Sequence, residues 1–118
     1  MMLETYKNKS ILITGNSGFK GSWLTIWLES LGAKVTGFSL DIPSSPSNYE
    51  TSNLKDFSNT IFKDIRNLDS LEEAVEQSQP DFIFHLAAQS LVRKSYQSPI
   101  DTFSVNAIGS MNVLEASR

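Results

Sequence analysis

Three glycines near the N-terminus have the spacing with which a turn can bind a dinucleotide. Gly15, Gly18 and Gly21 follow an apolar run that ends at Thr14, and they precede a segment with helical periodicity. The first glycine permits a tight turn, the second lets a pyrophosphate approach the backbone, and the third lets helix and strand pack closely. Backbone N–H groups at the start of the helix would face the phosphates, where the helix dipole favours negative charge. The expected phosphate-binding residues are Gly15, Ser17, Gly18, Phe19, Lys20 and Gly21.

Two of these assignments have alternatives. A lysine in the first turn of a helix opposes its dipole, so Lys20 either benefits from a bound anion or extends into water. The glycines could also serve an ordinary turn with close packing. The strand before them, the helix after them and an acidic residue further along the chain favour the dinucleotide.

That acidic residue is Asp41, which lies about 20 residues beyond Gly21 at the end of the second predicted strand. A carboxylate in this place accepts hydrogen bonds from adenosine ribose hydroxyls and repels a 2′-phosphate, which favours NAD over NADP. No arginine follows within the next several residues to reverse that preference. The alternative is an aspartate that only caps or closes a turn.

Further candidates follow the third and fourth predicted strands: Asp64, Ile65, Leu86, Ala87, Ala88 and Gln89. The carboxylate of Asp64 could accept a hydrogen bond from an adenine amino group, with the Ile65 side chain packed on the ring. The small residues after the fourth strand would let a cofactor pass close to the backbone, or would serve close packing of strand and helix. Asn106, in the last helix, either braces this region or lies on the surface.

Other prominent residues are interpreted as structural. The single histidine, His85, has apolar neighbours within its strand and is expected to be a satisfied core or supporting residue, not a base. Trp23 and Trp27 lie four positions apart on the first helix and are expected to pack. Arg93 and Lys94 are expected in a solvated loop before the last helix, with contact to substrate phosphates as the alternative.

The composition suits a globular protein and excludes several classes of function. Of the 118 residues, 40% are hydrophobic and 19% are charged, and the formal net charge is −3. This balance argues against nucleic acid or an acidic membrane as a partner. No segment approaches the ~18 apolar residues that span a bilayer, and the N-terminus has no signal-peptide core. With no cysteine and one histidine, we expect no disulfide, thiol catalysis or multi-histidine metal site, and a cytoplasmic location.

Strand signals alternate with helical signals, which predicts an α/β fold with a parallel sheet. The expected strands are 10–14, 34–40, 60–63 and 82–86, and the expected helices are 19–31, 68–78 and a last helix that begins at Pro99. A complete Rossmann sheet has about six strands in the order 3-2-1-4-5-6. Four strands predict an incomplete Rossmann-type sheet of order 3-2-1-4. Residues 1–118 are therefore expected to be the N-terminal part of an NAD-binding domain.

Together the motifs resemble the extended short-chain dehydrogenase/reductase superfamily. The resemblance rests on the glycine turn with Asp41 and on the segments 64–66, 85–89 and 106–109. A more specific similarity, to the CDP-glucose 4,6-dehydratases, rests on the segments 14–24, 31–37 and 87–96. One departure lies in the turn, where that family usually has histidine at the position of Asn16.

The resemblance implies NAD as the cofactor and a nucleotide sugar, CDP-glucose, as the substrate. Transient oxidation at C4 of the glucosyl group would make the C5 proton removable. Water would then be lost across C5 and C6, and the hydride would return to C6 to give CDP-4-keto-6-deoxyglucose. A homo-oligomer is also expected.

The catalytic Tyr-x-x-x-Lys pair of that superfamily does not occur in this chain. Tyr6, Tyr49 and Tyr96 are followed four positions later by serine, asparagine and isoleucine. We therefore expect the catalytic region and the C-terminal substrate domain beyond residue 118, an inactive fragment with weak NAD affinity, and self-association through an open fourth strand. The alternatives are another sugar-nucleotide epimerase or dehydratase, and a non-catalytic dinucleotide-binding module.

Overall fold

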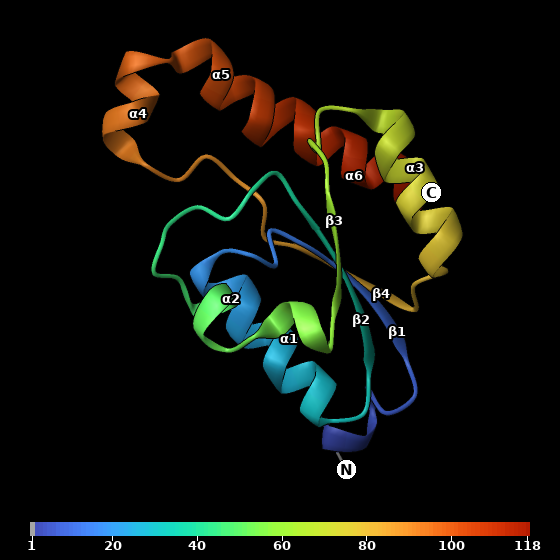
Figure 1. Ribbon diagram of the computed structural model, residues 1–118. Helices are drawn as coiled ribbons and strands as arrows, with labels where there is room; N and C mark the ends of the chain where they lie inside the picture. Colours follow the sequence, from blue (N-terminus) through green and yellow to red (C-terminus); the bar gives the residue numbers. More distant parts are fainter. Residues whose placement is uncertain (1) are drawn as a thin grey trace.

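A four-stranded parallel sheet forms the centre of the molecule (Figure 1). The computed structural model describes residues 2–118, and its strands have the order β3-β2-β1-β4. The expected Rossmann-type order 3-2-1-4 is confirmed. The strands are β1 (Ser10–Thr14), β2 (Lys34–Ser39), β3 (Asn59–Phe62) and β4 (Phe82–His85).

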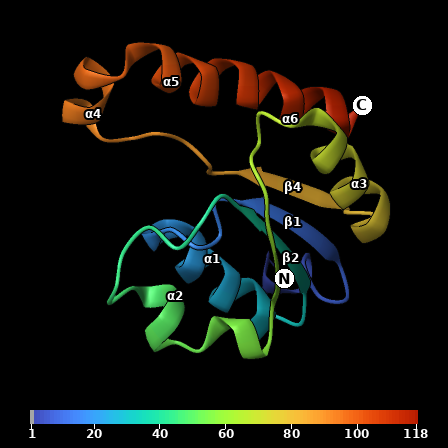
Figure 2. The same ribbon diagram turned by 45° about the horizontal axis from the view of Figure 1, so that its top comes forward.

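Helices connect the strands and cover both faces of the sheet, with α1 and α2 on one face and α3 and α6 on the other (Figures 1 and 2). The helices are α1 (Phe19–Ser30), α2 (Asn48–Thr51), α3 (Leu68–Ser78), α4 (Val92–Gln97), α5 (Pro99–Phe103) and α6 (Gly109–Ser117). Short 3₁₀ segments span Met2–Glu4 and Leu54–Asp56, and a π-helical turn, Ser104–Ile108, joins α5 to α6.

Two apolar clusters flank the sheet, because successive residues of a strand point to opposite faces. Leu12 of β1 lies in a cluster with residues of α3 and α6, whereas Ile11 and Ile13 lie in a second cluster with Leu28 of α1. These three β1 residues are at most 1% exposed. The carboxyl end of β1, and the turn that follows it, are therefore held between two packed layers.

The buried face of α1 combines small and polar residues with Leu28, and it is less apolar than its periodicity predicts. Gly21, Ser22 and Thr25 are buried, whereas Trp23 and Trp27 are each 54% exposed. The expectation that the two tryptophans pack is therefore wrong for the described part of the chain. Small residues let α1 approach the turn, since a bulkier face would hold the helix further from β1.

The helix α4 is not expected from the sequence. Arg93 and Lys94 lie within it, so their expected place in a loop is wrong. Six residues hold too little periodicity to distinguish a helix from a loop. Pro99 does begin the next helix, with Ser98 before it, as the sequence predicts.

Candidate functional site

The turn after β1 is so tight that two of its glycines admit no side chain. Gly15 has a φ of +77°, and a Cβ there would lie 2.7 Å from the backbone nitrogen of Ala87. A Cβ on Gly21 would overlap the carbonyl oxygen of Gly15. These two glycines therefore keep β1, α1 and the segment after β4 in contact, which is the packing that their spacing predicts.

Gly18 differs, because its own φ of −72° is open to any residue and little of the chain lies beside it. A Cβ there would meet only the Gly15 carbonyl oxygen, at 3.3 Å. Gly18 is the N-cap of α1, and within residues 2–118 the N–H groups of Phe19 and Lys20 have no protein acceptor. Open backbone with two free N–H groups at the start of a long helix suits an anion.

Fewer backbone N–H groups of the turn can face an anion than the sequence indicates. The Ser17 N–H donates to the Ser39 hydroxyl at 3.1 Å, and the Gly18 N–H donates to the Gly15 carbonyl at 3.1 Å. Both groups are used inside the turn, so the expectation that they point outward is wrong. The side chain of Lys20 is exposed, which leaves both of its interpretations open.

Asp41 lies beside the turn, as its spacing predicts. It follows β2 closely, and its carbonyl oxygen accepts a hydrogen bond from the Ser17 hydroxyl at 2.5 Å. Its side chain is exposed, and within residues 2–118 its carboxylate has no hydrogen-bond partner. The backbone of this residue is therefore held, while its carboxylate is free to accept hydrogen bonds from a ligand.

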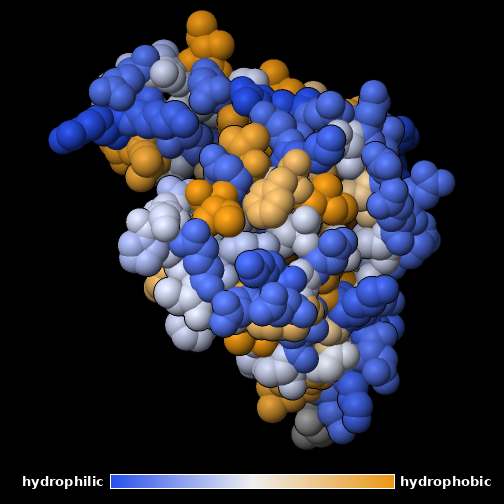
Figure 3. Space-filling model, viewed as in Figure 1, coloured by the Kyte–Doolittle hydropathy of each residue, from blue (hydrophilic) through white to orange (hydrophobic). Residues whose placement is uncertain are grey.

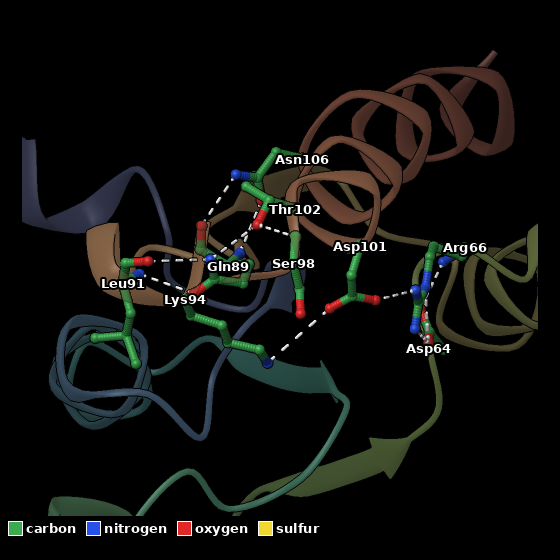
Figure 4. A network of polar contacts seen from close by, with 9 residues as sticks. All are labelled: Asp64, Arg66, Gln89, Leu91, Lys94, Ser98, Asp101, Thr102 and Asn106. Carbon is green, nitrogen blue, oxygen red and sulfur yellow. Dashed lines mark hydrogen bonds and ion pairs between the residues drawn. The ribbon is translucent and has the colours of Figure 1, made fainter. Parts of the chain in front are cut away.

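Asp64 is engaged by a nearby arginine (Figure 4). Its carboxylate accepts hydrogen bonds from Arg66 on both oxygens, the shortest from Nη2 at 2.6 Å. The same guanidinium donates through Nη1 to Asp101 of α5 at 2.7 Å. Hydrogen bonding to this guanidinium holds the pKa of Asp64 below its usual value. Arg66 contacts both oxygens of this partly exposed carboxylate, and its contact with an adenine amino group stays a prediction.

Ile65 faces the core and not the ligand side of the sheet. Its side chain is 5% exposed and packs in the cluster that contains Leu12. Gly109 of α6 lies against it, since a Cβ there would be 2.5 Å from the Ile65 Cδ1. The expectation that this side chain packs on an adenine ring is therefore wrong.

The segment after β4 passes directly over the glycine turn. The Leu86 N–H donates to the Thr14 carbonyl at 3.0 Å, and the Ala87 N–H donates to the Thr14 hydroxyl at 3.2 Å. A Cβ on Gly15 would overlap the backbone of Leu86 and Ala87, so the close packing of the two segments depends on Gly15. Ala88, the next residue, is exposed.

Gln89 is held by the π-helical turn (Figure 4). Asn106 accepts the Gln89 N–H on Oδ1 at 2.8 Å and donates through Nδ2 to the Gln89 carbonyl at 3.0 Å. The Gln89 side chain bonds to the Thr102 hydroxyl and to the backbone of Leu91. Asn106 is exposed and still braces the loop after β4, so both of its interpretations apply.

His85 has a polar partner on each ring nitrogen. Nδ1 lies 2.6 Å from the Thr14 Oγ1, and Nε2 lies 2.8 Å from the Ser110 Oγ. Ser110 donates its hydrogen to the Asn106 carbonyl, so it accepts from Nε2–H, and in a neutral ring Thr14 then donates to Nδ1. Desolvation by burial lowers the pKa of His85 and so favours this neutral ring. The histidine is satisfied, as expected, although it lies at the exposed end of its strand.

Asn16 is the polar residue of the turn that the sequence interpretation leaves without a role. Its side chain is 0% exposed and bonds to Ser39 of β2 and to Thr60 of β3. The signal for it is weak, because asparagine is common in turns for reasons unrelated to a ligand.

A family model described as GDP-mannose 4,6 dehydratase matches residues 12–118. The chain belongs to this family. Within it, the chain is 43% identical over 110 residues to the CDP-glucose 4,6-dehydratase of Salmonella typhimurium, a match that covers 93% of the chain and 31% of that protein. It is 33% identical over 120 residues to the GDP-mannose 4,6-dehydratase of Yersinia enterocolitica, covering 93% of the chain and 31% of that protein. The chain thus spans 31% of the length of each of these curated relatives.

Solved structures in the same superfamily have this fold. An epimerase from Methanothermobacter thermautotrophicus superposes with a TM-score of 0.84 and 30% identity, covering 98% of the chain and 33% of the epimerase. The UDP-glucose 4-epimerase of Thermus thermophilus, solved in complex with NAD, gives a TM-score of 0.77 and 29% identity. The match covers 90% of the chain and 32% of that epimerase. Within residues 2–118 of our chain, no helix is long and apolar enough to cross a membrane.

Proposed function

We propose that the chain is the cofactor-binding part of an NAD-dependent nucleotide-sugar 4,6-dehydratase whose substrate is CDP-glucose. The observation that carries the proposal is the open backbone at Gly18 beside the free carboxylate of Asp41. An anion site there lies next to an acceptor for hydroxyl groups. A dinucleotide presents both partners, a pyrophosphate and an adenosine ribose.

Each part of the site has a distinct task in this proposal. The N–H groups of Phe19 and Lys20 hold the pyrophosphate, and Asp41 accepts from the ribose hydroxyls and repels a 2′-phosphate. Gly15 and Gly21 keep the surrounding segments close enough to form the site. NAD, when bound, supplies reversible hydride transfer. Residues of this chain bind and orient it, and none of them is assigned to the reacting sugar.

The choice of CDP-glucose rests on the relatives. Identity to the CDP-glucose enzyme is 43%, against 33% to the GDP-mannose enzyme of Yersinia enterocolitica. The net reaction would remove water from CDP-glucose and give CDP-4-keto-6-deoxyglucose. A second candidate is an epimerase of the same superfamily, because the solved structures named above are epimerases.

We also propose that residues 1–118 are the N-terminal part of the Rossmann-type domain. The Tyr-x-x-x-Lys pair and the substrate domain would then belong to a longer gene product. The 118-residue chain alone would bind NAD weakly and turn over no sugar. Sequencing the reading frame past codon 118 tests this extent directly.

Calorimetric titration of the full-length gene product with NAD and with NADP tests the cofactor assignment. Wild type is expected to prefer NAD. Asp41→Asn should weaken NAD binding about tenfold or more and reduce the preference, because hydrogen bonds to a charged acceptor are lost. Asp56→Asn is the matched control, since this exposed carboxylate precedes β3 at the amino end of the strands, whereas Asp41 follows β2 at the carboxyl end.

Binding of neither dinucleotide by the full-length protein would contradict the proposal. An unchanged preference in Asp41→Asn would show that this aspartate only closes a turn. Turnover of CDP-glucose, compared with dTDP-glucose and GDP-mannose at equal concentration, separates the substrate candidates.

A further inference from the structure

Asn16 stands inside the glycine turn, yet its side chain lies beneath the turn and is fully buried. Its Oδ1 accepts from the Ser39 hydroxyl at 2.7 Å, and its Nδ2 donates to the Thr60 Oγ1 at 2.9 Å. The Thr60 oxygen also accepts from the hydroxyl of Tyr49 at 3.1 Å. One amide therefore joins the turn to β2, to β3 and, through Thr60, to α2.

Gly37 of β2 leaves the space for this amide. A Cβ on Gly37 would overlap the side chain of Asn16. Gly37 is not among the glycines with positive φ, and glycine in the interior of a strand is unfavourable without a packing reason. The side chain of Asn16 supplies that reason.

A directed series of hydrogen bonds leads from Asn16 to Asp41. Ser39 donates its hydroxyl hydrogen to Asn16 and accepts the Ser17 N–H at 3.1 Å, and the Ser17 hydroxyl donates to the Asp41 carbonyl at 2.5 Å. A hydroxyl has one hydrogen, so each of these serines has a defined direction. Asn16, Ser39 and Ser17 are at most 4% exposed, which shields the series from competing water.

We propose that Asn16 is a positioning residue of the cofactor site, which holds the backbone of Asp41 through Ser39 and Ser17 and thereby sets the preference for NAD over NADP. The inference rests on the function proposed above. The Asp41 carboxylate has no partner within residues 2–118, so its place depends on its backbone. A carboxylate held at the ribose accepts from a 2′-hydroxyl and repels a 2′-phosphate.

The competing explanation is that Asn16 only stabilises the fold. Both explanations expect Asn16→Ala to lower the melting temperature, because buried partners lose their hydrogen bonds. Only the positioning role expects a change in the ratio of the two dinucleotide affinities. That ratio is therefore the deciding measurement.

The experiment compares wild type, Asn16→Ala and Ser39→Ala in the full-length gene product. Kd values for NAD and NADP come from calorimetric titration. Both variants should lower the ratio of the NADP Kd to the NAD Kd about threefold to tenfold, mainly through weaker NAD binding. Ser39→Ala removes one hydroxyl from the middle of the series, so it decides the question if Asn16→Ala fails to fold.

Val35→Ala is the control for lost stability. Val35 is 2% exposed and lies on β2, the strand that also holds Ser39, but near its opposite end. This variant should melt earlier and keep the wild-type ratio. A shifted ratio in Val35→Ala would overturn the inference, because general loosening would then suffice.

An unchanged ratio in the variants that bind NAD overturns the inference and leaves the proposed function intact. Loss of binding to both dinucleotides in wild type removes the inference and the proposed function together. The geometry is tested separately by Gly37→Ala, which should destabilise wild type much more than it destabilises Asn16→Ala. Equal destabilisation in the two backgrounds would also overturn the inference, since the added methyl group would not meet the amide.

Discussion

A methyl group at position 18 would approach the Gly15 carbonyl oxygen to 3.3 Å and meet no other neighbour, whereas one at position 21 would overlap that oxygen. The two glycines belong to one motif, but they are needed for different structural reasons. Gly21 is required by the packing of α1 on the turn. The demand on Gly18 is weaker, because a Cβ there would meet only the Gly15 carbonyl oxygen, and the open space beside it suits a ligand.

Gly18→Ala is therefore expected to keep the fold and to lose affinity for NAD by about tenfold, because the added methyl group occupies the space of the anion. Gly21→Ala is expected to destabilise the fold by about 1–3 kcal/mol, because backbone atoms must move. Thermal melting and NAD titration of the two full-length variants measure these effects. Wild-type affinity in Gly18→Ala would show that no ligand approaches this position.

At the scale of elements, His85 joins β4 to β1 through Thr14 and to α6 through Ser110. In the neutral ring, Nδ1 accepts from Thr14 and Nε2 donates to Ser110. The folded-state pKa of His85 lies below its usual value because burial disfavours the charged form. The unfolded chain thus binds the proton more readily than the folded chain.

Stability is consequently expected to decrease as the pH falls below about 6.5, the usual histidine value, and to stop decreasing from this cause below the folded-state pKa. Denaturant unfolding between pH 5 and pH 8 measures the slope. His85→Gln should show a smaller decrease, because the group that takes up the proton is gone.

Glu29 acts in the opposite direction, since burial raises its pKa. Both wild type and His85→Gln contain it, so the difference between the two curves isolates the histidine. Parallel curves would contradict the assigned neutral ring.

The elements show what periodicity can and cannot predict. The strands and α3 could be predicted because apolar periods are local signals, and the strand order followed from the order of a Rossmann sheet. The exposure of the tryptophans on α1 could not be predicted, because large apolar residues at helical spacing are usually core residues. At the site, Asp41 and the glycines could be placed by spacing. The position of Arg66, which binds Asp64, depends on its tertiary contact with Asp101. The core position of Ile65 depends on its contact with Gly109 of α6.

At the scale of the whole molecule, separate apolar side chains lie exposed among hydrophilic ones near α4 and α5 (Figure 3), and further ones lie on α6. Along the last helical segments, Ile100 is 85% exposed, Phe103 73% and Leu114 72%. β4 is also the outer strand of the described sheet next to β1. Exposed apolar faces and open strand edges both favour association with another chain.

The isolated 118-residue chain is therefore expected to self-associate as its concentration rises, which sedimentation velocity can follow. A variant that combines Phe103→Ser with Leu114→Ser should remain monomeric to higher concentration. Leu3→Ser is the control, since Leu3 is 57% exposed but lies in the N-terminal segment. Equal effects of the two variants would mean that association does not use the last helices.

The pairing of Asn16 with Gly37 has a consequence for protein engineering. Glycine turns are attractive as portable cassettes that could be grafted from one nucleotide-binding protein to another. Here the turn and the middle of β2 share one volume, because the amide of Asn16 occupies the place of a β2 side chain. A graft of residues 14–21 into a host with any larger residue at the position of Gly37 should therefore fail, and a graft that carries both should succeed.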